Sequence, residues 1–298
     1  MACQDASDDQ KKGLKCEELV IDIPSDLEPA EWPECCIYRV PKKLRKVNKD
    51  AYTPKLISIG PLHHLRQECR DMEKQKLRYL KAFCDRTGKS QEDLARIIEK
   101  KEVNIRHCYA DSSKLSRKEF IKMVMLDGIF IIELFWRNSA EKECEKDYIL
   151  SKPWLRDGIQ HDLLLLENQL PYFILEDLYM SVCRGSSSCN DHHHTEGQQM
   201  KKPKKEHKDT PFLKLCRNYF YKYDQQPKTE MVIGKAIKHF TDLLRYFFYP
   251  LELEETEKKA IDRLCSATKL DEAGVKFKQV KERHLLDIRF QKGNVSPS

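Results

Sequence analysis

Apolar residues recur with a helical period over much of the chain that follows Asp71. The first such segment ends at Gly88, and one face of it contains Met72, Leu77, Leu80 and Cys84. The second segment starts after Ser90, which with Asp93 three residues later resembles a capping pair, and its apolar spacing continues to Cys108. These two segments predict a helical hairpin.

The longest apolar segment starts near Ser116 and ends at Trp136, and it predicts a buried helix. Two further helices are predicted over 159–170 and from Pro171 onward, because proline is suited to a first helical turn. The remaining helical patterns lie at 212–221, 236–248 and 256–270. Gly274 follows and is typical of a helix end.

Apolar and polar residues alternate in two short segments near the C-terminus, 275–277 and 286–290. This period of two is typical of half-buried strands. The chain is therefore predicted to be an α+β protein that is predominantly α-helical, with a helical core and a small strand region near the C-terminus.

The same pattern predicts the domain organisation. Residues 1–36 are acid-rich and weakly patterned, and they are expected to form a mobile leader. Segment 37–64 contains three prolines that forbid long helices, so it is expected to wrap the core. One helical domain then occupies 37–183 and continues over 211–298. Residues 184–210 between its two parts are too polar to order and predict a disordered loop.

Composition and charge narrow the class of protein. The 298 residues include 54 Lys and Arg against 48 Asp and Glu, a net charge of +6 that is too small to indicate a nucleic-acid partner. The N-terminus lacks the basic start and apolar run of a secretory signal, and no segment reaches the roughly 18 apolar residues that cross a bilayer. We therefore expect a cytoplasmic chain whose 12 cysteines are mostly reduced.

Sequence motifs of hydrolases, dinucleotide-binding proteins and zinc modules are missing from the chain, so no cofactor and no small-molecule substrate is predicted. Two clusters contain metal-ligating residue types: His63 and His64 with Cys69, and the tract from Cys183 to His207. Neither cluster has the spacing of a recognised zinc module. A metal site in the tract stays open beside the ordinary interpretation, an unoccupied polar loop.

Asp127 is a carboxylate on an otherwise apolar helical face, four residues after Met123 and four before Ile131. A buried carboxylate needs a partner, and we expect a structural hydrogen bond or an ion pair from another segment, for example with Arg39 or Arg106. The alternative is that Asp127 acts as the general acid or base of a hydrolase or transferase.

Asp162, Glu167, Asn168 and Gln169 flank the apolar run 163–166. The two carboxylates are five residues apart, about 140° around a helix, so they do not share a face. We interpret the four residues as helix caps and interhelical polar contacts. A carboxylate pair that acts in hydrolysis is the alternative.

A basic run lies between Tyr38 and Tyr52 and comprises Lys42, Lys43, Arg45, Lys46 and Lys49. It lacks the aromatic interleaving of proteins that bind single-stranded nucleic acid, so no nucleic-acid partner is predicted. The run is a candidate contact for an anionic membrane surface or an acidic protein partner. A solvated face is the ordinary alternative.

Several short segments together resemble one plant family. The sequences IYRVP at 37–41, AYTP at 51–54 and ISIGPLHH at 57–64 are similar in order and spacing to the opening of the family known as domain of unknown function 247. Later blocks up to residue 293 are similar too, including DLLLLENQLP at 162–171. The candidate structural or recognition residues are Tyr38, Arg39, Pro41, Tyr52, Pro54, Gly60, Pro61, His63, His64, Asp127, Glu133, Asp162, Glu167, Asn168, Gln169 and Pro171.

This resemblance implies a function without an active site. The family has no established catalytic residues, so we expect a non-enzymatic protein that recognises another, unidentified protein in signalling, defence, stress or self/non-self recognition. Typical members continue to a C-terminal helix that spans the membrane once, which places them at the plasma membrane, and this chain resembles a C-terminally shortened member. A membrane-associated scaffold that uses the basic run is the alternative.

Overall fold

The computed structural model describes residues 29, 31–111, 113–183, 209–224, 237–248 and 265–277, and within these ranges the chain is predominantly helical, as predicted. Three short 3-10 helices, Lys49–Tyr52, Pro61–His63 and Gln67–Cys69, lie between the first two α-helices. The α-helices are α1 (Lys42–Val47), α2 (Arg70–Thr87), α3 (Gln91–Glu99), α4 (Glu102–His107), α5 (Arg117–Ser139), α6 (Glu141–Cys144), α7 (Pro153–Asp162), α8 (Tyr172–Cys183), α9 (Pro211–Tyr219), α10 (Phe240–Phe247) and α11 (Ala267–Glu272).

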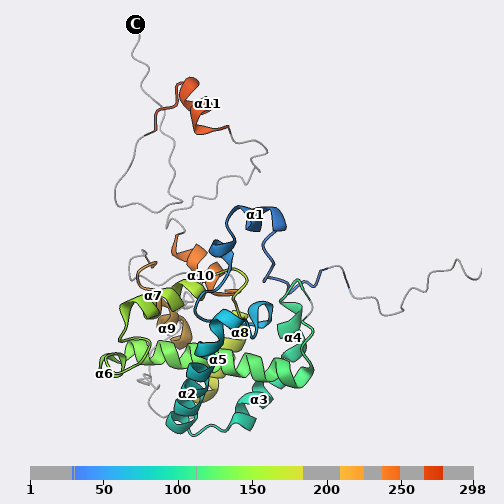
Figure 1. Ribbon diagram of the computed structural model, residues 1–298, viewed down its shortest axis with the longest axis vertical. Coiled ribbons are helices and arrows are strands. Elements are labelled where there is room, and N and C mark those ends of the chain that lie inside the picture. The colour runs from blue at the N-terminus through green and yellow to red at the C-terminus, as the bar shows by residue number, and fades with distance from the viewer. Residues whose placement is uncertain are drawn as a thin grey trace, which may run out of the picture.

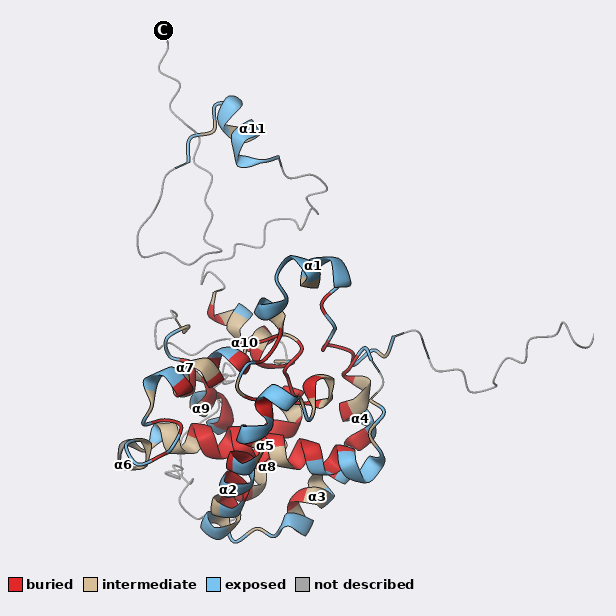
Figure 2. Cartoon of the chain, in the orientation of Figure 1, coloured by how far each residue is buried: buried red, intermediate tan, exposed pale blue. Residues whose placement is uncertain are grey.

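Helix α5 is the centre of the fold (Figure 1), and α2, α3, α6, α8 and α9 pack against it. It starts with a capping box, in which the side chains and backbone N–H groups of Ser116 and Glu119 bond to each other reciprocally. Nearly every position from Phe120 to Phe135 is buried, and Figure 2 shows this stretch as the red core of the bundle. The predicted buried helix is confirmed. Neither α5 nor any other described helix is long and apolar enough to cross a membrane.

An aromatic cluster joins α5 to the later helices. Phe135 stacks on Tyr219 with the ring centroids 4.2 Å apart, and its ring centroid lies 5.5 Å from those of Phe220 and Phe240. Phe220 and Phe240 also contact each other, at 5.3 Å. Aromatic pairs in such arrangements stabilise a fold by about 0.5–1.5 kcal/mol each beyond the burial of their area. The cluster therefore holds α9 and α10 on the bundle.

Two local signals separate α2 from α3. Gly88 adopts a left-handed conformation with φ 67° and closes α2 by donating its N–H to the carbonyl oxygen of Cys84. Ser90 and Asp93 form the predicted capping box that begins α3. The sequence placed Leu77 on the buried face of α2, and this is wrong. Leu77 is 57% exposed, and its neighbour Lys76 is buried instead.

The predicted helix over 159–170 is wrong. Helix α7 ends at Asp162, and turns follow it to residue 170. Within these turns Asn168 donates to the carbonyl oxygen of Asp162, and Gln169 donates to those of Leu163 and Leu165. Polar side chains that bond to nearby backbone favour turns over helix. The spacing of apolar residues gives no information about these side-chain hydrogen bonds, so it predicted a helix.

The predicted small strand region is not supported. Residues 275–277 follow α11 and Gly274 as irregular chain, and Phe277 is 60% exposed. A period of two over three residues does not produce a strand without a neighbouring strand to pair with. The α+β expectation is therefore corrected to a predominantly helical fold. Segments 286–290, 256–264 and 184–208 lie outside the described residues.

The segment from residue 37 to residue 64, here called the wrapping segment, passes over the bundle in extended chain and short helical turns (Figure 1). Its start is held because Ile37 donates its backbone N–H to the carbonyl oxygen of Cys108. Just before it, Trp32 stacks on His107 with centroids 3.6 Å apart. The packed chain therefore begins before Ile37, earlier than the expected end of the leader.

Gly60 marks the closest approach of the wrapping segment to the turns that follow α7. Its φ of 72° and ψ of −178° are values that residues with a Cβ rarely adopt. A Cβ built at this position lies 2.4 Å from the carbonyl oxygen of Gln169. Backbone conformation and space both require glycine here.

These two constraints predict a large cost for Gly60→Ala. We expect the free energy of unfolding to fall by about 3 kcal/mol, because the strain and the clash add. Gly88→Ala is the matched control: Gly88 also has a positive φ, but a Cβ there meets nothing within 4 Å, so only about 1 kcal/mol is expected. Urea denaturation measures both values, and equal losses would contradict the close approach.

Candidate functional site

Lys76 and Asp127 form an ion pair where the wrapping segment, α2 and α5 meet. The Nζ of Lys76 donates to Oδ1 of Asp127 at 2.6 Å. The same Nζ donates to the carbonyl oxygen of Ser58 and to Oε1 of Glu73, each also at 2.6 Å. The second oxygen of Asp127 accepts the backbone N–H of Gly60 at 2.9 Å. The two side chains are 1% and 2% exposed, so the pair is closed to solvent.

The surroundings of this pair affect both pKa values. Burial raises the pKa of Asp127 above its ordinary value, although the attraction of Lys76 opposes the shift. Burial also disfavours the charge on Lys76, but the attractions of Asp127 and Glu73 together outweigh it and raise the pKa of Lys76. A lysine with a raised pKa keeps its proton at neutral pH and does not serve as a base. The geometry favours a structural role for the pair.

Asp162 and Asn168 bind the backbone of the wrapping segment. The Asp162 carboxylate accepts, at 2.7 to 3.1 Å, the consecutive N–H groups of Lys55, Leu56 and Ile57. Asn168 accepts the N–H of Ile59 at 2.6 Å and donates to the carbonyl oxygen of Ile57 at 3.0 Å. Burial raises the pKa of Asp162, and the three amide donors oppose this shift. These side chains replace the strand partner that an extended segment normally has.

Gln169 joins the turns after α7 to two other parts of the bundle. Its Oε1 accepts the backbone N–H of Phe240, the first residue of α10, at 3.0 Å. Its own carbonyl oxygen accepts the hydroxyl of Tyr109 at 2.9 Å. Its Nε2 donates to two nearby carbonyl groups, as described above, so both the oxygen and the nitrogen of the Gln169 amide form hydrogen bonds.

Glu167 is fully buried and holds the start of the wrapping segment. It accepts the backbone N–H of Val40 at 2.6 Å and forms an ion pair with Arg45 of α1. The Nε2 of His63 lies 3.4 Å from its other oxygen. Burial outweighs the attraction of Glu167 and lowers the pKa of His63 to about 4, so the imidazole is neutral at pH 7 and this contact is not an ion pair. The name polar clamp is used below for these residues: Lys76, Asp127, Asp162, Glu167, Asn168 and Gln169.

A second polar network connects α2, α5 and the segment after α6. Glu133 is fully buried, and one of its oxygens accepts Nη2 of Arg86 at 3.0 Å and Nε of Arg137 at 2.8 Å. Arg137 also donates to Asp147 at 2.8 Å, and the hydroxyl of Tyr79 donates to the other oxygen of Asp147 at 2.7 Å. Of the two roles expected for Glu133, structural or recognition, this geometry favours the structural one.

The partners suggested for Asp127 were wrong. Arg39 instead forms an ion pair with Asp111, and Arg106 forms one with Glu102. Sequence reasoning missed Lys76. It lies midway between Met72 and Leu80, four residues from each, and so shares their helix face. That spacing is the signal that places Lys76 on the buried side of α2.

The other candidate residues of the wrapping segment shape its backbone. The hydroxyl of Tyr38 donates to the Glu31 carboxylate and to the carbonyl oxygen of Cys35. The others are positioned at turns: Pro41 precedes α1, Tyr52 ends one 3-10 helix, Pro54 follows it, and Pro61 and His64 begin and cap the next. Pro171 directly precedes α8. None of these residues lines the groove between α3 and α5 that is described below.

The basic run forms α1 and the turn after it. None of the residues of α1 is buried, and Lys42, Lys43, Lys46 and Lys49 are exposed to solvent. Arg45 is the exception, because it reaches back to Glu167. Four of the five cations therefore project outward.

Metal ligation has no support in the part of the chain that the structure describes, where no group of three or more His, Cys, Asp or Glu side chains could hold an ion. The cluster of His63, His64 and Cys69 falls within that part. The tract from Cys183 to His207 lies outside it except for Cys183.

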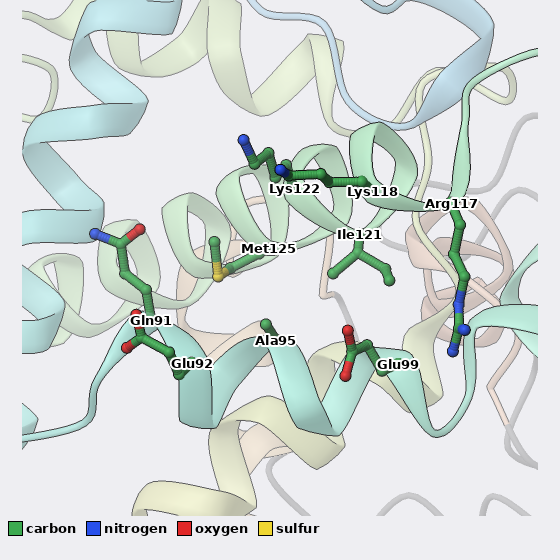
Figure 3. A pocket seen from close by; sticks show the side chains of 9 residues that line it. All are labelled: Gln91, Glu92, Ala95, Glu99, Arg117, Lys118, Ile121, Lys122 and Met125. Atoms are coloured by element: carbon green, nitrogen blue, oxygen red, sulfur yellow. The ribbon is translucent and has the colours of Figure 1, made fainter.

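A groove lies between α3 and α5 and has a volume of about 490 Å³ (Figure 3). Its floor is apolar and its rims are charged. Ala95, Ile121 and Met125 form the floor. The rims contain Gln91, Glu92 and Glu99 from α3 and Arg117, Lys118 and Lys122 from α5. No residue of the polar clamp lines this groove, and sequence reasoning did not single it out.

Comparisons with known proteins agree with the sequence resemblance. A family model described as plant protein of unknown function matches residues 37–296. The UPF0481 protein At3g47200 of Arabidopsis thaliana is 32% identical over 296 residues, which cover 90% of this chain and 58% of that protein. The putative UPF0481 protein At3g02645 of the same plant is 28% identical over 172 residues, or 57% of this chain and 32% of that protein. No solved structure matches the chain.

The buried ion pair predicts that Lys76→Met is strongly destabilising. The substitution leaves the charge of Asp127 buried without its partner, and we expect a loss of about 3–5 kcal/mol in the free energy of unfolding. Lys74→Met is the control, because Lys74 is exposed on the same helix, and a change within about 0.5 kcal/mol is expected. Adding Asp127→Asn to Lys76→Met should recover part of the loss. A double variant less stable than Lys76→Met alone contradicts a charge-based cause.

The neutral state of His63 predicts a loss of stability on acidification. Between its ordinary pKa of 6.5 and its folded pKa of about 4, the unfolded chain binds a proton that the folded chain does not. The contribution of neutral His63 to the free energy of unfolding is therefore complete above pH 6.5 and is lost as the pH falls toward 4. From about pH 7.5 to about pH 5, the wild type should lose about 2 kcal/mol more than His63→Gln. Urea denaturation at both pH values tests this, and equal losses would refute it.

Proposed function

The chain belongs to the plant family known as domain of unknown function 247, and we propose that it is a non-enzymatic module that recognises an acidic segment of another protein. The chain spans 58% and 32% of the lengths of the two relatives described above, so the proposal concerns this part of the architecture. Roles in signalling, defence, stress or self/non-self recognition, and a cytoplasmic location, are further proposals that follow from the family resemblance.

One observation carries the proposal: a cationic helix stands free of the bundle while its base is anchored. The name α1 surface is used for the outward-facing residues Lys42, Lys43, Leu44, Lys46, Val47 and Lys49. Leu44 and Val47 are 54% and 84% exposed, so apolar groups lie between the lysines. Among the described residues, these lysines form no ion pair. Their charges are available to a partner.

The anchor makes this surface suited to recognition. Glu167 binds Val40 just before α1 and Arg45 within it, so the helix is attached on its inner side. A surface that is already ordered loses less conformational entropy when it binds. Opposite charge on a partner speeds the encounter and selects against basic partners.

The buried carboxylates give the rival hydrolase or transferase hypothesis little to use. Asp127 is paired with Lys76, Asp162 accepts three backbone N–H groups, and Glu167 holds Arg45. A general acid or base must reach a substrate, and these carboxylates line neither the α3–α5 groove nor the groove beside α8 that contains Lys101 and Asp177. This supports the non-enzymatic proposal.

An anionic membrane surface is the second candidate partner, and the exposure of Leu44 and Val47 among lysines is the observation that favours it. Apolar side chains can enter the interface of a bilayer while lysines contact anionic headgroups. A membrane-associated scaffold would use the same residues. The two candidates differ in what the α1 surface binds and are separated by experiment.

We expect a fluorescent peptide of alternating Glu and Leu to bind the full chain, and the variant K42Q/K43Q/K46Q/K49Q to bind it at least about tenfold more weakly, because four cations are lost. The control K74Q/K81Q/K214Q/K276Q removes four exposed lysines elsewhere and should change the Kd less than about twofold. Fluorescence anisotropy measures the affinities. Equal weakening by both variants would indicate net charge alone and contradict a defined surface.

Vesicles of phosphatidylcholine with and without phosphatidylserine, used in flotation with the same three proteins, decide between the partners. The proposal predicts no lysine-dependent flotation. Flotation that requires phosphatidylserine and is lost in K42Q/K43Q/K46Q/K49Q, without peptide binding, would replace it with the membrane hypothesis.

A further inference from the structure

The α3–α5 groove carries charges of opposite sign on its two rims. Glu92 and Glu99 lie seven residues apart on α3, two helical turns or about 10.5 Å along the axis. Lys118 and Lys122 lie one turn apart on α5. The two helices run in opposite directions beside each other, so the acidic and basic rims follow the same groove (Figure 3).

These four rim charges are unpaired among the residues that the structure describes. Glu92, Glu99, Lys118 and Lys122 take part in none of its ion pairs. A second groove of about 240 Å³, between the end of α3 and α8, differs in this respect. There Lys101 and Asp177 form an ion pair at 2.5 Å. The α3–α5 groove keeps its opposite charges apart and available.

The shape of the groove fits a helix. Its floor consists of Ala95 from α3 with Ile121 and Met125 from α5, and the small side chain of Ala95 lets another backbone approach closely. The groove is open to solvent and follows two helices, whereas small-molecule pockets enclose most of their ligand. An amphipathic helix places an apolar stripe in such a groove and its flanks against the rims.

We propose that the α3–α5 groove binds an amphipathic helix of a partner protein that has basic residues along one flank and acidic residues along the other. Its basic flank faces Glu92 and Glu99, and its acidic flank faces Lys118 and Lys122. Small apolar residues spaced by helical turns face the floor. The site lies on different helices from the α1 surface, so this inference goes beyond the proposed function and stands independently of it.

The small apolar area and the exposed charges of the groove determine how tightly it can bind and how binding depends on salt. Ile121 and Met125 are only 6% and 7% exposed, so little apolar area is left to bury. Binding must then depend mainly on the rims, and exposed charges are screened by salt. We expect affinity in the micromolar range that weakens at least about tenfold between about 0.05 M and about 0.5 M NaCl.

The probe is a stapled helical peptide of about 14 residues with a stripe of Ala residues, three Lys on one flank and three Glu on the other. Two comparison peptides carry six Lys or six Glu on the flanks. All measurements use the full-length variant K42Q/K43Q/K46Q/K49Q, because the α1 surface would otherwise take the acidic peptide. This background also separates failure of the groove from failure of the proposed function.

Fluorescence anisotropy should show that the bipolar peptide binds at least about tenfold more tightly than either uniform peptide. Adding Glu92→Lys and Glu99→Lys makes both rims basic, and the preference should change to the six-Glu peptide. The matched control adds Glu145→Lys and Glu272→Lys, two exposed acidic residues away from the groove, and should keep the original preference. No saturable binding, equal binding of the three peptides, or the same change in the control would overturn the proposal.

Discussion

The fold depends on one buried ion pair, between Lys76 of α2 and Asp127 of α5. Burying either charge alone is strongly unfavourable, so each side chain requires the other. The pair also holds the wrapping segment, because Lys76 binds the carbonyl oxygen of Ser58 and Asp127 binds the N–H of Gly60. Two helices and an irregular segment therefore meet at a single electrostatic contact. The other residues of the polar clamp act in a similar way farther along the segment. Their side chains form the hydrogen bonds with its backbone that a neighbouring strand would form in a sheet.

Much of the helical core followed from the sequence because its causes are local. Apolar spacing and capping residues predicted α2, α3 and α5, including the capping pair at Ser90 and the helix start near Ser116. The prediction failed where a side chain's partner is distant. The turns after α7 depend on contacts of Asn168 with residues more than a hundred positions earlier, and Lys76 displaced Leu77 from the core because of Asp127. Apolar spacing does not contain such long-range pairings.

The candidate site, too, was predicted in part: the sequence identified most of its residues but not their distant contacts. The family resemblance selected nearly every residue of the polar clamp, but it did not say what each residue contacts. Their geometry points inward, toward backbone groups and each other, and it accounts for them as parts of the fold. The surfaces with unpaired charge, α1 and the α3–α5 groove, were found by different means: the first as a basic run, the second only after α3 and α5 had been placed side by side. A groove between two helices has no signature in either helix alone.

The polar clamp also bears on how the chain is made. Asp162 binds backbone groups 105 to 107 residues earlier, and Glu167 binds one 127 residues earlier. A ribosome adds about 5–20 residues per second, so the residues of the wrapping segment that Asp162 and Glu167 bind emerge roughly 5–25 s before these two side chains. During that interval the backbone N–H groups of Val40 and of residues 55–57 lack their native acceptors. Newly made chains therefore present a defined, proline-containing stretch to chaperones, and a pause in translation before codon 162 would prolong that exposure.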